Sequence, residues 1–203
     1  MTNGTPEFWE KHFSAKQEMW GMEPALSAIA ARDLFVQYHV KNVLVPGIGY
    51  GRNARVFLDS GMAVTGIEIS RTAIALARKH YGDGMVLHHG SVTGMPFDDK
   101  QYDGIFCYAL IHLLDAQERA KLVRDCYAQL APGGCMIFTM ITKAASTYGK
   151  GHLISEDRYE LHAGAPMFFY DKQSVQREFG AYGLVEVKDI TEQFPFYLAV
   201  CKK

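Results

Sequence analysis

The sequence lacks the features that mark several specialised protein classes. Lys plus Arg number 21 and Asp plus Glu number 22, so the basic excess of a dedicated nucleic-acid binder is missing. No C-x-x-C pair occurs among the 4 cysteines, which argues against zinc ribbons, thioredoxin-type sites and a disulfide framework. No apolar run approaches the roughly 18 residues that span a bilayer, and no basic start followed by an apolar stretch marks a secretory signal. We therefore predict a cytoplasmic protein that binds neither nucleic acid nor a membrane.

The residues that are present fit one globular domain over residues 1–203. Hydrophobic residues make up 48% of the chain, and this length can bury a core without a metal or a disulfide. The oligomeric state stays open between a monomer and a homodimer. An exposed strand edge would be one way for two copies to pair.

Short apolar runs alternate with amphipathic stretches along most of the chain. Strands are expected at residues 42–45, 63–69, 85–88, 102–108 and 135–141, with helices near 25–39, 53–60, 71–81 and 116–130. This alternation predicts an α/β fold with a doubly wound, Rossmann-like, mostly parallel sheet. Residues 184–190 and 196–201 have no room for a helix between them, so they predict a C-terminal antiparallel hairpin and a total of about seven strands. Residues 143–170 show no clear period and predict an irregular lid or binding loop.

A glycine-rich loop follows the first predicted strand. Gly47, Gly49 and Gly51 alternate with other residues, and Glu68 lies at the end of the second strand. Such glycines let a ligand approach the backbone, and a carboxylate at this point can accept hydrogen bonds from both hydroxyls of a ribose. Arg52 stands where a dinucleotide fingerprint has its third glycine, so the spacing favours an adenosyl ligand without a pyrophosphate. The loop alone would also fit a plain tight turn.

The order of the motifs resembles that of the class I S-adenosylmethionine-dependent methyltransferases of the small-molecule type. Several stretches resemble the tellurite-resistance and the thiopurine and halide methyltransferase branches. The matching stretches are residues 47–51, 52–54, 64–70, 95–97, 102–103, 110–114 and 130–134.

The resemblance implies S-adenosylmethionine as the cofactor and S-adenosylhomocysteine as the product. The methionine moiety would lie along the glycine loop, the ribose hydroxyls on Glu68, and the sulfonium beside Tyr108. The implied cofactor-binding residues are Gly47, Ile48, Gly49, Tyr50, Gly51, Asn53, Glu68, Ile69, Ser91, Val92, Tyr108 and Ala109.

Two departures from the family pattern keep other functions open. Val45 and Ser91 replace acidic residues that the family usually carries near the cofactor. A binding protein of the same fold without catalysis therefore stays an alternative. An NAD(P)-dependent oxidoreductase is a further alternative, against which Arg52 argues.

The implied reaction is an in-line displacement on a small-molecule methyl acceptor, for which the protein mainly supplies proximity and alignment. An acceptor that loses a proton can need a base, and His112 is the candidate, although it could equally pack under the cofactor. By analogy with the family, residues 1–40 cover the cofactor and residues 143–170 form a substrate-side lid. Trp20, Tyr148 and Tyr170 are then candidates for substrate contact, with core packing or solvent exposure as their alternatives.

No metal site is expected. His88 and His89 are neighbours on a predicted strand, so their side chains point to opposite faces and cannot chelate one ion together.

Overall fold

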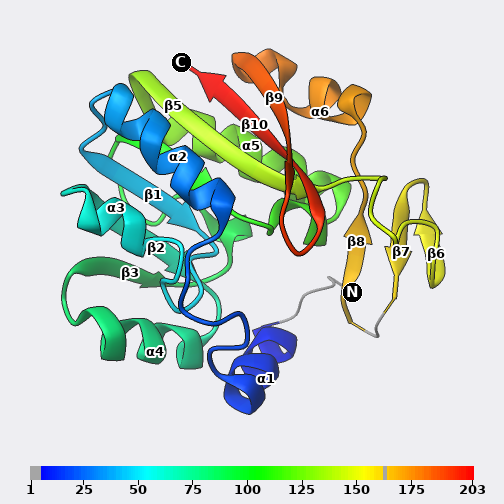
Figure 1. Cartoon of the computed structure of the whole chain (residues 1–203), viewed down its shortest axis with the longest axis horizontal. Coiled ribbons are helices and arrows are strands. Elements are labelled where there is room, and N and C mark those ends of the chain that lie inside the picture. Colours follow the sequence, from blue (N-terminus) through cyan, green and yellow to red (C-terminus); the bar gives the residue numbers. More distant parts are fainter. Residues whose placement is uncertain (1–5, 162–163) are drawn as a thin grey trace.

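A computed structural model describes residues 6–161 and 164–203 and shows a seven-stranded sheet in the order β3-β2-β1-β4-β5-β10-β9 (Figure 1). The neighbours from β3 to β5 pair in parallel, and β10 pairs antiparallel with both β5 and β9. The predicted mostly parallel sheet with a C-terminal hairpin is therefore confirmed. Its strands are β1 Asn42–Pro46, β2 Ala63–Glu68, β3 Met85–His89, β4 Tyr102–Cys107, β5 Leu130–Ile141, β9 Leu184–Thr191 and β10 Pro195–Lys202.

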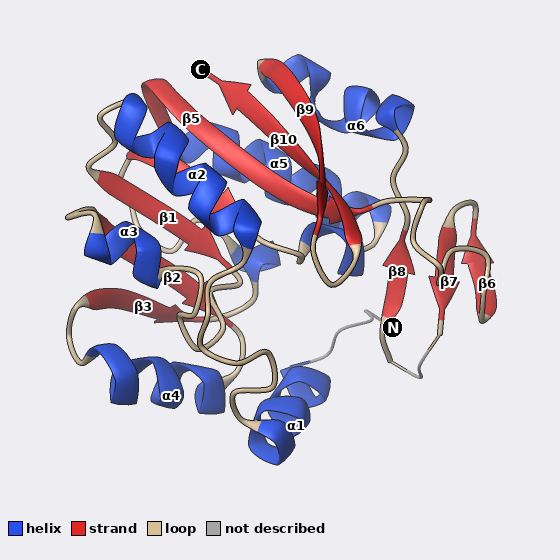
Figure 2. Cartoon of the chain, viewed as in Figure 1, coloured by secondary structure: helices blue, strands red, loops and turns tan. Residues whose placement is uncertain are grey.

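Helices cover both faces of this sheet (Figure 2). Successive side chains on a strand point to opposite faces, so Ile137 of β5 packs with α2 and α3, whereas Phe138 packs with α5 and α6. The two faces thus share one sheet and have separate apolar cores. The helices are α1 Pro6–Lys16, α2 Leu26–Gln37, α3 Arg55–Asp59, α4 Arg71–Tyr81, α5 Ala116–Gln129 and α6 Lys172–Phe179, with short 3-10 turns at Val92–Gly94, Ile111–Leu113 and Gly180–Tyr182.

Helix starts follow the local sequence. The Ser70 hydroxyl accepts a hydrogen bond from the Ala73 backbone N–H at 3.1 Å and caps α4, as predicted. Asp115 and Glu118 form a reciprocal capping box at the start of α5. These caps fix where the two helices begin after β2 and β4, and so they fix the loops in which site residues lie.

The prediction of an irregular segment over residues 143–170 is wrong. This stretch contains a small antiparallel sheet of β6 His152–Ser155, β7 Arg158–Glu160 and β8 Pro166–Phe168, in the order β6-β7-β8. The strands are too short to give a sequence period. The Lys143 ammonium joins the segment to α6, because it lies 2.6 Å from the carboxylates of both Asp157 and Asp171. Helix α6 was also not predicted.

In the part of the chain that the structure describes, no helix is both long enough and apolar enough to cross a lipid bilayer.

Candidate functional site

A cavity of about 940 Å³ opens at the carboxyl ends of β1, β2 and β4. The chain order reverses between β1 and β4, because β2 and β3 extend the sheet in one direction and β5 extends it in the other. Ligands of open α/β sheets bind in the crevice at such a reversal. The cavity therefore lies where this fold is expected to bind a small molecule.

The glycine loop forms one wall of the cavity. Gly47 and Gly49 have φ angles of +71° and +58°, which residues with a side chain rarely adopt. A Cβ on Gly47 would also lie 2.1 Å from Cδ1 of Leu110, so a side chain there requires Leu110 to shift. The N–H groups of Gly47 and Ile48 both donate to the Ile67 carbonyl oxygen, at 2.9 and 3.1 Å. These bonds hold the loop against the end of β2.

Glu68 lies opposite the loop, at the end of β2, and is 6% exposed. One carboxylate oxygen accepts from the Gly49 N–H at 2.8 Å and the other from the Ser70 N–H at 2.9 Å. Burial raises the pKa of this carboxyl, and the backbone hydrogen bonds oppose that rise. Because each oxygen can accept a second bond, the carboxylate can still take two hydroxyls from a ligand in the cavity.

Beyond Glu68, the wall continues through Ile69 and then Ser91 and Val92. The Ser91 hydroxyl caps the short helical turn that follows, since it accepts from the Thr93 N–H at 3.2 Å. The position thus serves the local backbone and provides no carboxylate. Ile69 and Val92 give this part of the cavity two apolar side chains, which suit a flat ring.

Aromatic side chains line another part of the cavity wall, which we call the aromatic end. Trp20 and Tyr50 stack with ring centroids 6.3 Å apart, and Phe194 and Phe196 enter from the β9–β10 turn and β10. Phe13 of α1 closes the group with an edge contact to Trp20. These side chains come from three separate stretches of the chain and enclose a space that suits an apolar group.

Glu192, which sequence reasoning missed, fastens the β9–β10 turn over the aromatic end. Its carboxylate accepts from the Ser27 N–H and from the Tyr108 hydroxyl, both at 2.7 Å. Burial and this carboxylate raise the pKa of Tyr108, so its hydroxyl stays protonated and donates. Ser27 is 165 residues away from Glu192 along the chain, so no sequence pattern could have indicated the contact.

Comparisons with known proteins agree on one family. Residues 44–138 match a family model described as a methyltransferase domain. The ubiquinone biosynthesis O-methyltransferase of Pseudomonas savastanoi pv. phaseolicola is 27% identical over 113 residues, which are 53% of this chain and 47% of that protein. Residues 44–138, just under half of the chain, are therefore similar to a methyltransferase domain. It spans about half the length of the curated relatives that it matches.

Solved structures of methyltransferases share the fold of this chain. The 1,6-didemethyltoxoflavin-N1-methyltransferase of Burkholderia thailandensis, solved with bound 1,6-didemethyltoxoflavin and S-adenosylhomocysteine, superposes with a TM-score of 0.77 at 15% identity, over 98% of this chain and 86% of that one. An S-adenosylmethionine-dependent methyltransferase of Clostridium acetobutylicum gives 0.74 at 11% identity, over 97% and 98% of the two chains. At these identities the likeness concerns the fold alone.

Most of the site residues predicted from the sequence line this one cavity. They are Trp20, Gly47, Ile48, Gly49, Tyr50, Asn53, Glu68, Ile69, Ser91, Val92, Tyr108, Ala109 and His112. Asn53 also holds the chain before α2, because its side-chain oxygen accepts from the Ala25 N–H at 2.9 Å. Gly51 is absent from the wall, since a Cβ there would point at Tyr81 and Met85, behind the loop.

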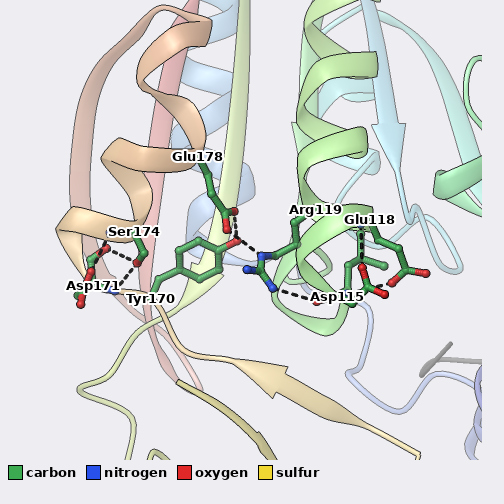
Figure 3. Close-up of polar contacts among 8 residues, drawn as sticks. Asp115, Glu118, Arg119, Tyr170, Asp171, Ser174 and Glu178 are labelled. Atoms are coloured by element: carbon green, nitrogen blue, oxygen red, sulfur yellow. Dashed lines mark hydrogen bonds and ion pairs between the residues drawn. The ribbon is translucent and has the colours of Figure 1, made fainter. Parts of the chain in front are cut away.

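Tyr148 and Tyr170 do not line the cavity, so the structure corrects their predicted place. The Tyr148 hydroxyl donates to Asp157 at 2.7 Å. Tyr170 is fully buried, and Figure 3 shows its hydroxyl directed at Glu178, to which it donates at 2.7 Å. The Arg119 side chain bonds the same carboxylate at 2.9 Å. Both tyrosines therefore hold structural elements together.

The two predicted covering segments contribute unequally to the cavity. From α1, Trp9, Phe13 and Lys16 line it, whereas Met167 is the one lining residue among the described part of 143–170. Across the described residues, no group of three or more His, Cys, Asp or Glu could hold a metal ion.

Proposed function

We propose that this protein is a methyltransferase that moves a methyl group from S-adenosylmethionine to a small-molecule acceptor. The observation that carries the proposal is Glu68, which lines the cavity and whose two carboxylate oxygens are each fixed by a backbone N–H. A ribose offers two adjacent hydroxyl donors, which this carboxylate matches. The carboxylate therefore fits the sugar of an adenosyl ligand.

The remaining cofactor contacts follow from the walls on either side of Glu68. Gly47 and Gly49 leave backbone space for the methionine moiety, and the apolar Ile69 and Val92 flank the adenine. We place the sulfonium near Ala109, whose φ of +48° turns the chain sharply after β4 and whose N–H is held by the Thr139 hydroxyl at 2.8 Å. Helix α1 would cover the bound cofactor.

The cofactor supplies a methyl group that is already activated by the positive sulfur. The carbon–sulfur bond breaks as the acceptor atom bonds the methyl carbon, and the electron pair of the broken bond returns to sulfur. The protein's part is to hold the two reactants in line, which can be worth about 7–11 kcal/mol. The aromatic end of the cavity would hold the acceptor beside the methyl group.

The relatives support a ring-shaped acceptor. The matched Pseudomonas protein is named for O-methylation in ubiquinone biosynthesis, and the Burkholderia structure holds a didemethyltoxoflavin. Trp20, Tyr50, Phe194 and Phe196 give this chain an aromatic surface that would pack against such a ring. We propose that the enzyme works in the cytoplasm on a free small molecule, as a monomer or homodimer, without nucleic acid or membrane.

Calorimetric titration with S-adenosylhomocysteine, with NADH as the control, tests the cofactor. We expect micromolar binding of the first and none of the second. A preference for NADH would support an oxidoreductase. A turnover assay with S-adenosylmethionine and a panel of phenols and N-heterocycles then separates an enzyme from a non-catalytic binding protein.

A further inference from the structure

His112 occupies the boundary between the two ends of the cavity. It lies in the turn Ile111–Leu113 that follows β4, lines the cavity and is 5% exposed. The Phe196 ring lies beside the imidazole, with ring centroids 6.2 Å apart. The two ring nitrogens therefore have few possible hydrogen-bond partners. Each hydrogen bond that they make constrains where the proton of the imidazole lies.

The backbone of β5 decides which ring nitrogen carries the proton. Thr142 N–H donates to the Pro195 carbonyl oxygen of the neighbouring strand, so the N–H of the preceding residue, Ile141, points to the other side. The register of β4 with β5 stops at Phe138. Beyond Phe138, the Ile141 N–H is free of β4, and it donates a hydrogen bond to Nδ1 of His112 at 3.4 Å.

A backbone N–H can only donate, so Nδ1 must be the unprotonated nitrogen of the ring. The proton of the neutral imidazole then lies on Nε2. Within the described residues, Nε2 has no hydrogen-bond partner and is not sealed off from solvent, and the residue faces the cavity. The ring thus presents an N–H donor to a ligand there.

We propose that His112 binds the methyl acceptor as a neutral hydrogen-bond donor, through Nε2–H, and does not act as its general base. The inference rests on the proposed methyltransferase function and adds the chemistry of the acceptor. A base needs a free electron pair on the nitrogen that faces the substrate, and here that nitrogen carries hydrogen. A proton lost by the acceptor passes to solvent.

The surroundings keep the ring neutral. Burial lowers the pKa of His112 to about 3, and no carboxylate of the described residues bonds it. Protonating the ring would also place a hydrogen on Nδ1 and break the bond from Ile141. The donor is therefore present throughout the neutral pH range.

The cavity around Nε2 indicates the class of acceptor. Leu114, Ile141, Met167 and Phe196 are apolar lining residues. Two of the charged lining residues are engaged elsewhere: Arg52 donates to two backbone carbonyl oxygens, and Glu192 accepts from Ser27 and Tyr108. The site fits an uncharged, largely apolar ring that offers one carbonyl oxygen or one unprotonated ring nitrogen to His112.

Nitrogen-15 NMR of the histidine rings tests the tautomer directly in the full chain with S-adenosylhomocysteine. Two-bond proton–nitrogen correlations should show His112 with hydrogen on Nε2 only, unchanged between about pH 5.5 and 8.5; the His112→Asn spectrum assigns the signal. Hydrogen on Nδ1, or titration of the ring near its usual pKa of about 6.5, would overturn the proposal.

A matched pair of probes tests the donor. Indane and 1-indanone share a shape, and only the ketone can accept a hydrogen bond. In the S-adenosylhomocysteine complex we expect the wild-type protein to prefer 1-indanone by roughly three- to tenfold more than His112→Asn does. The asparagine oxygen can take the place of Nδ1 as acceptor of the Ile141 N–H, and its amide N–H groups end short of the position of Nε2, so this variant withdraws the donor from the acceptor.

An equal preference in the two proteins, or no binding of either probe, would overturn the acceptor assignment. Titration of the same samples with S-adenosylhomocysteine separates the two proposals. Failure of that titration contradicts the methyltransferase function. The NMR measurement reports the tautomer of His112 whether or not S-adenosylhomocysteine binds.

Discussion

The two ends of the cavity place a carboxylate in different ways. At the cofactor end, Glu68 bonds the N–H groups of Gly49 and Ser70, which are 19 and 2 residues away along the chain. At the aromatic end, Glu192 bonds Ser27 and Tyr108, which are 165 and 84 residues away. The first carboxylate is held by the turns beside its own strand. The second has no partner until the whole sheet has formed.

We relate this difference to the two proposed roles of the cavity, which are cofactor binding at one end and acceptor binding at the other. The cofactor end offers mostly backbone groups, which change little when side chains change. The aromatic end consists of side chains, namely Phe13 of α1, Trp20, Tyr50 of the glycine loop, and Phe194 and Phe196 of the β9–β10 hairpin. Substitutions in the β9–β10 hairpin are therefore expected to change which acceptor binds without disturbing the cofactor site.

Removing the carboxylate at the cofactor end should give the largest effect. In Glu68→Ala the ribose hydroxyls lose their acceptor, and the N–H groups of Gly49 and Ser70 lose theirs. A hydrogen bond to a charged group is worth about 1.5–3 kcal/mol, so the affinity for S-adenosylhomocysteine should fall roughly tenfold or more in a calorimetric titration. Glu68→Gln keeps the shape and one acceptor oxygen and should lose less. Unchanged affinity in the alanine variant would contradict the ribose assignment.

Alanine substitutions at Gly47 and Gly49 should destabilise the cofactor end to different extents. Both have positive φ, yet a Cβ on Gly47 would lie 2.1 Å from Leu110, whereas the nearest atom to one on Gly49 is Phe13 Cζ at 3.8 Å. Left-handed backbone costs each alanine variant about 1–2 kcal/mol, and Gly47→Ala adds the clash. Thermal unfolding without ligand should show the larger loss for Gly47→Ala. Equal losses would mean that Leu110 moves aside freely.

Substitutions around Glu192 should lower the stability of the fold without changing the affinity for the cofactor. Glu192→Ala leaves the Ser27 N–H and the Tyr108 hydroxyl without their acceptor, so we expect a loss of about 1–3 kcal/mol in the free energy of unfolding. Tyr108→Phe removes only one of these bonds and should cost less. In both variants the affinity for S-adenosylhomocysteine should stay within about twofold of wild type. A loss as large as that of Glu68→Ala would show that the two ends are not separate.

The smallest effect is expected where α1 meets α4. Glu10 accepts hydrogen bonds from the hydroxyls of Ser70 and Thr72, and these bonds lower its pKa below the usual 4.5. A lowered pKa means that the contact stabilises the fold above that usual value and is lost as the pH falls through the lowered one. Glu10→Gln should therefore release S-adenosylhomocysteine a few-fold faster in stopped-flow measurements at pH 7. Its effect should shrink as the pH drops towards 4 and below, and an effect that grows would contradict a role for the carboxylate.

The sequence predicted elements whose signals are local. The glycine loop, the strand before it and the Ser70 cap depend on residues a few positions apart, and the structure has all three. The strands β6 to β8 escaped prediction because they are short and because their attachment depends on Lys143, which meets Asp157 and Asp171 only in the folded chain.

Tyr170 shows the same limit in a single side chain. In the sequence it ends a polar, glycine-containing stretch, which suggested a substrate lid. In the fold its N–H donates to the Ile141 carbonyl oxygen at 2.9 Å, so its backbone lies beside the end of β5. Its ring is then buried next to Arg119 and Glu178 (Figure 3).

By itself, the sequence determined the α/β sheet and the cofactor end of the cavity, because hydrophobic periodicity, glycine conformation and helix capping act between near neighbours in the chain. Only the tertiary structure decided the aromatic end and the chemistry of His112. The pairing of β10 with β5 turns the Ile141 N–H towards this imidazole, and that distant register fixes which of its nitrogens carries the proton.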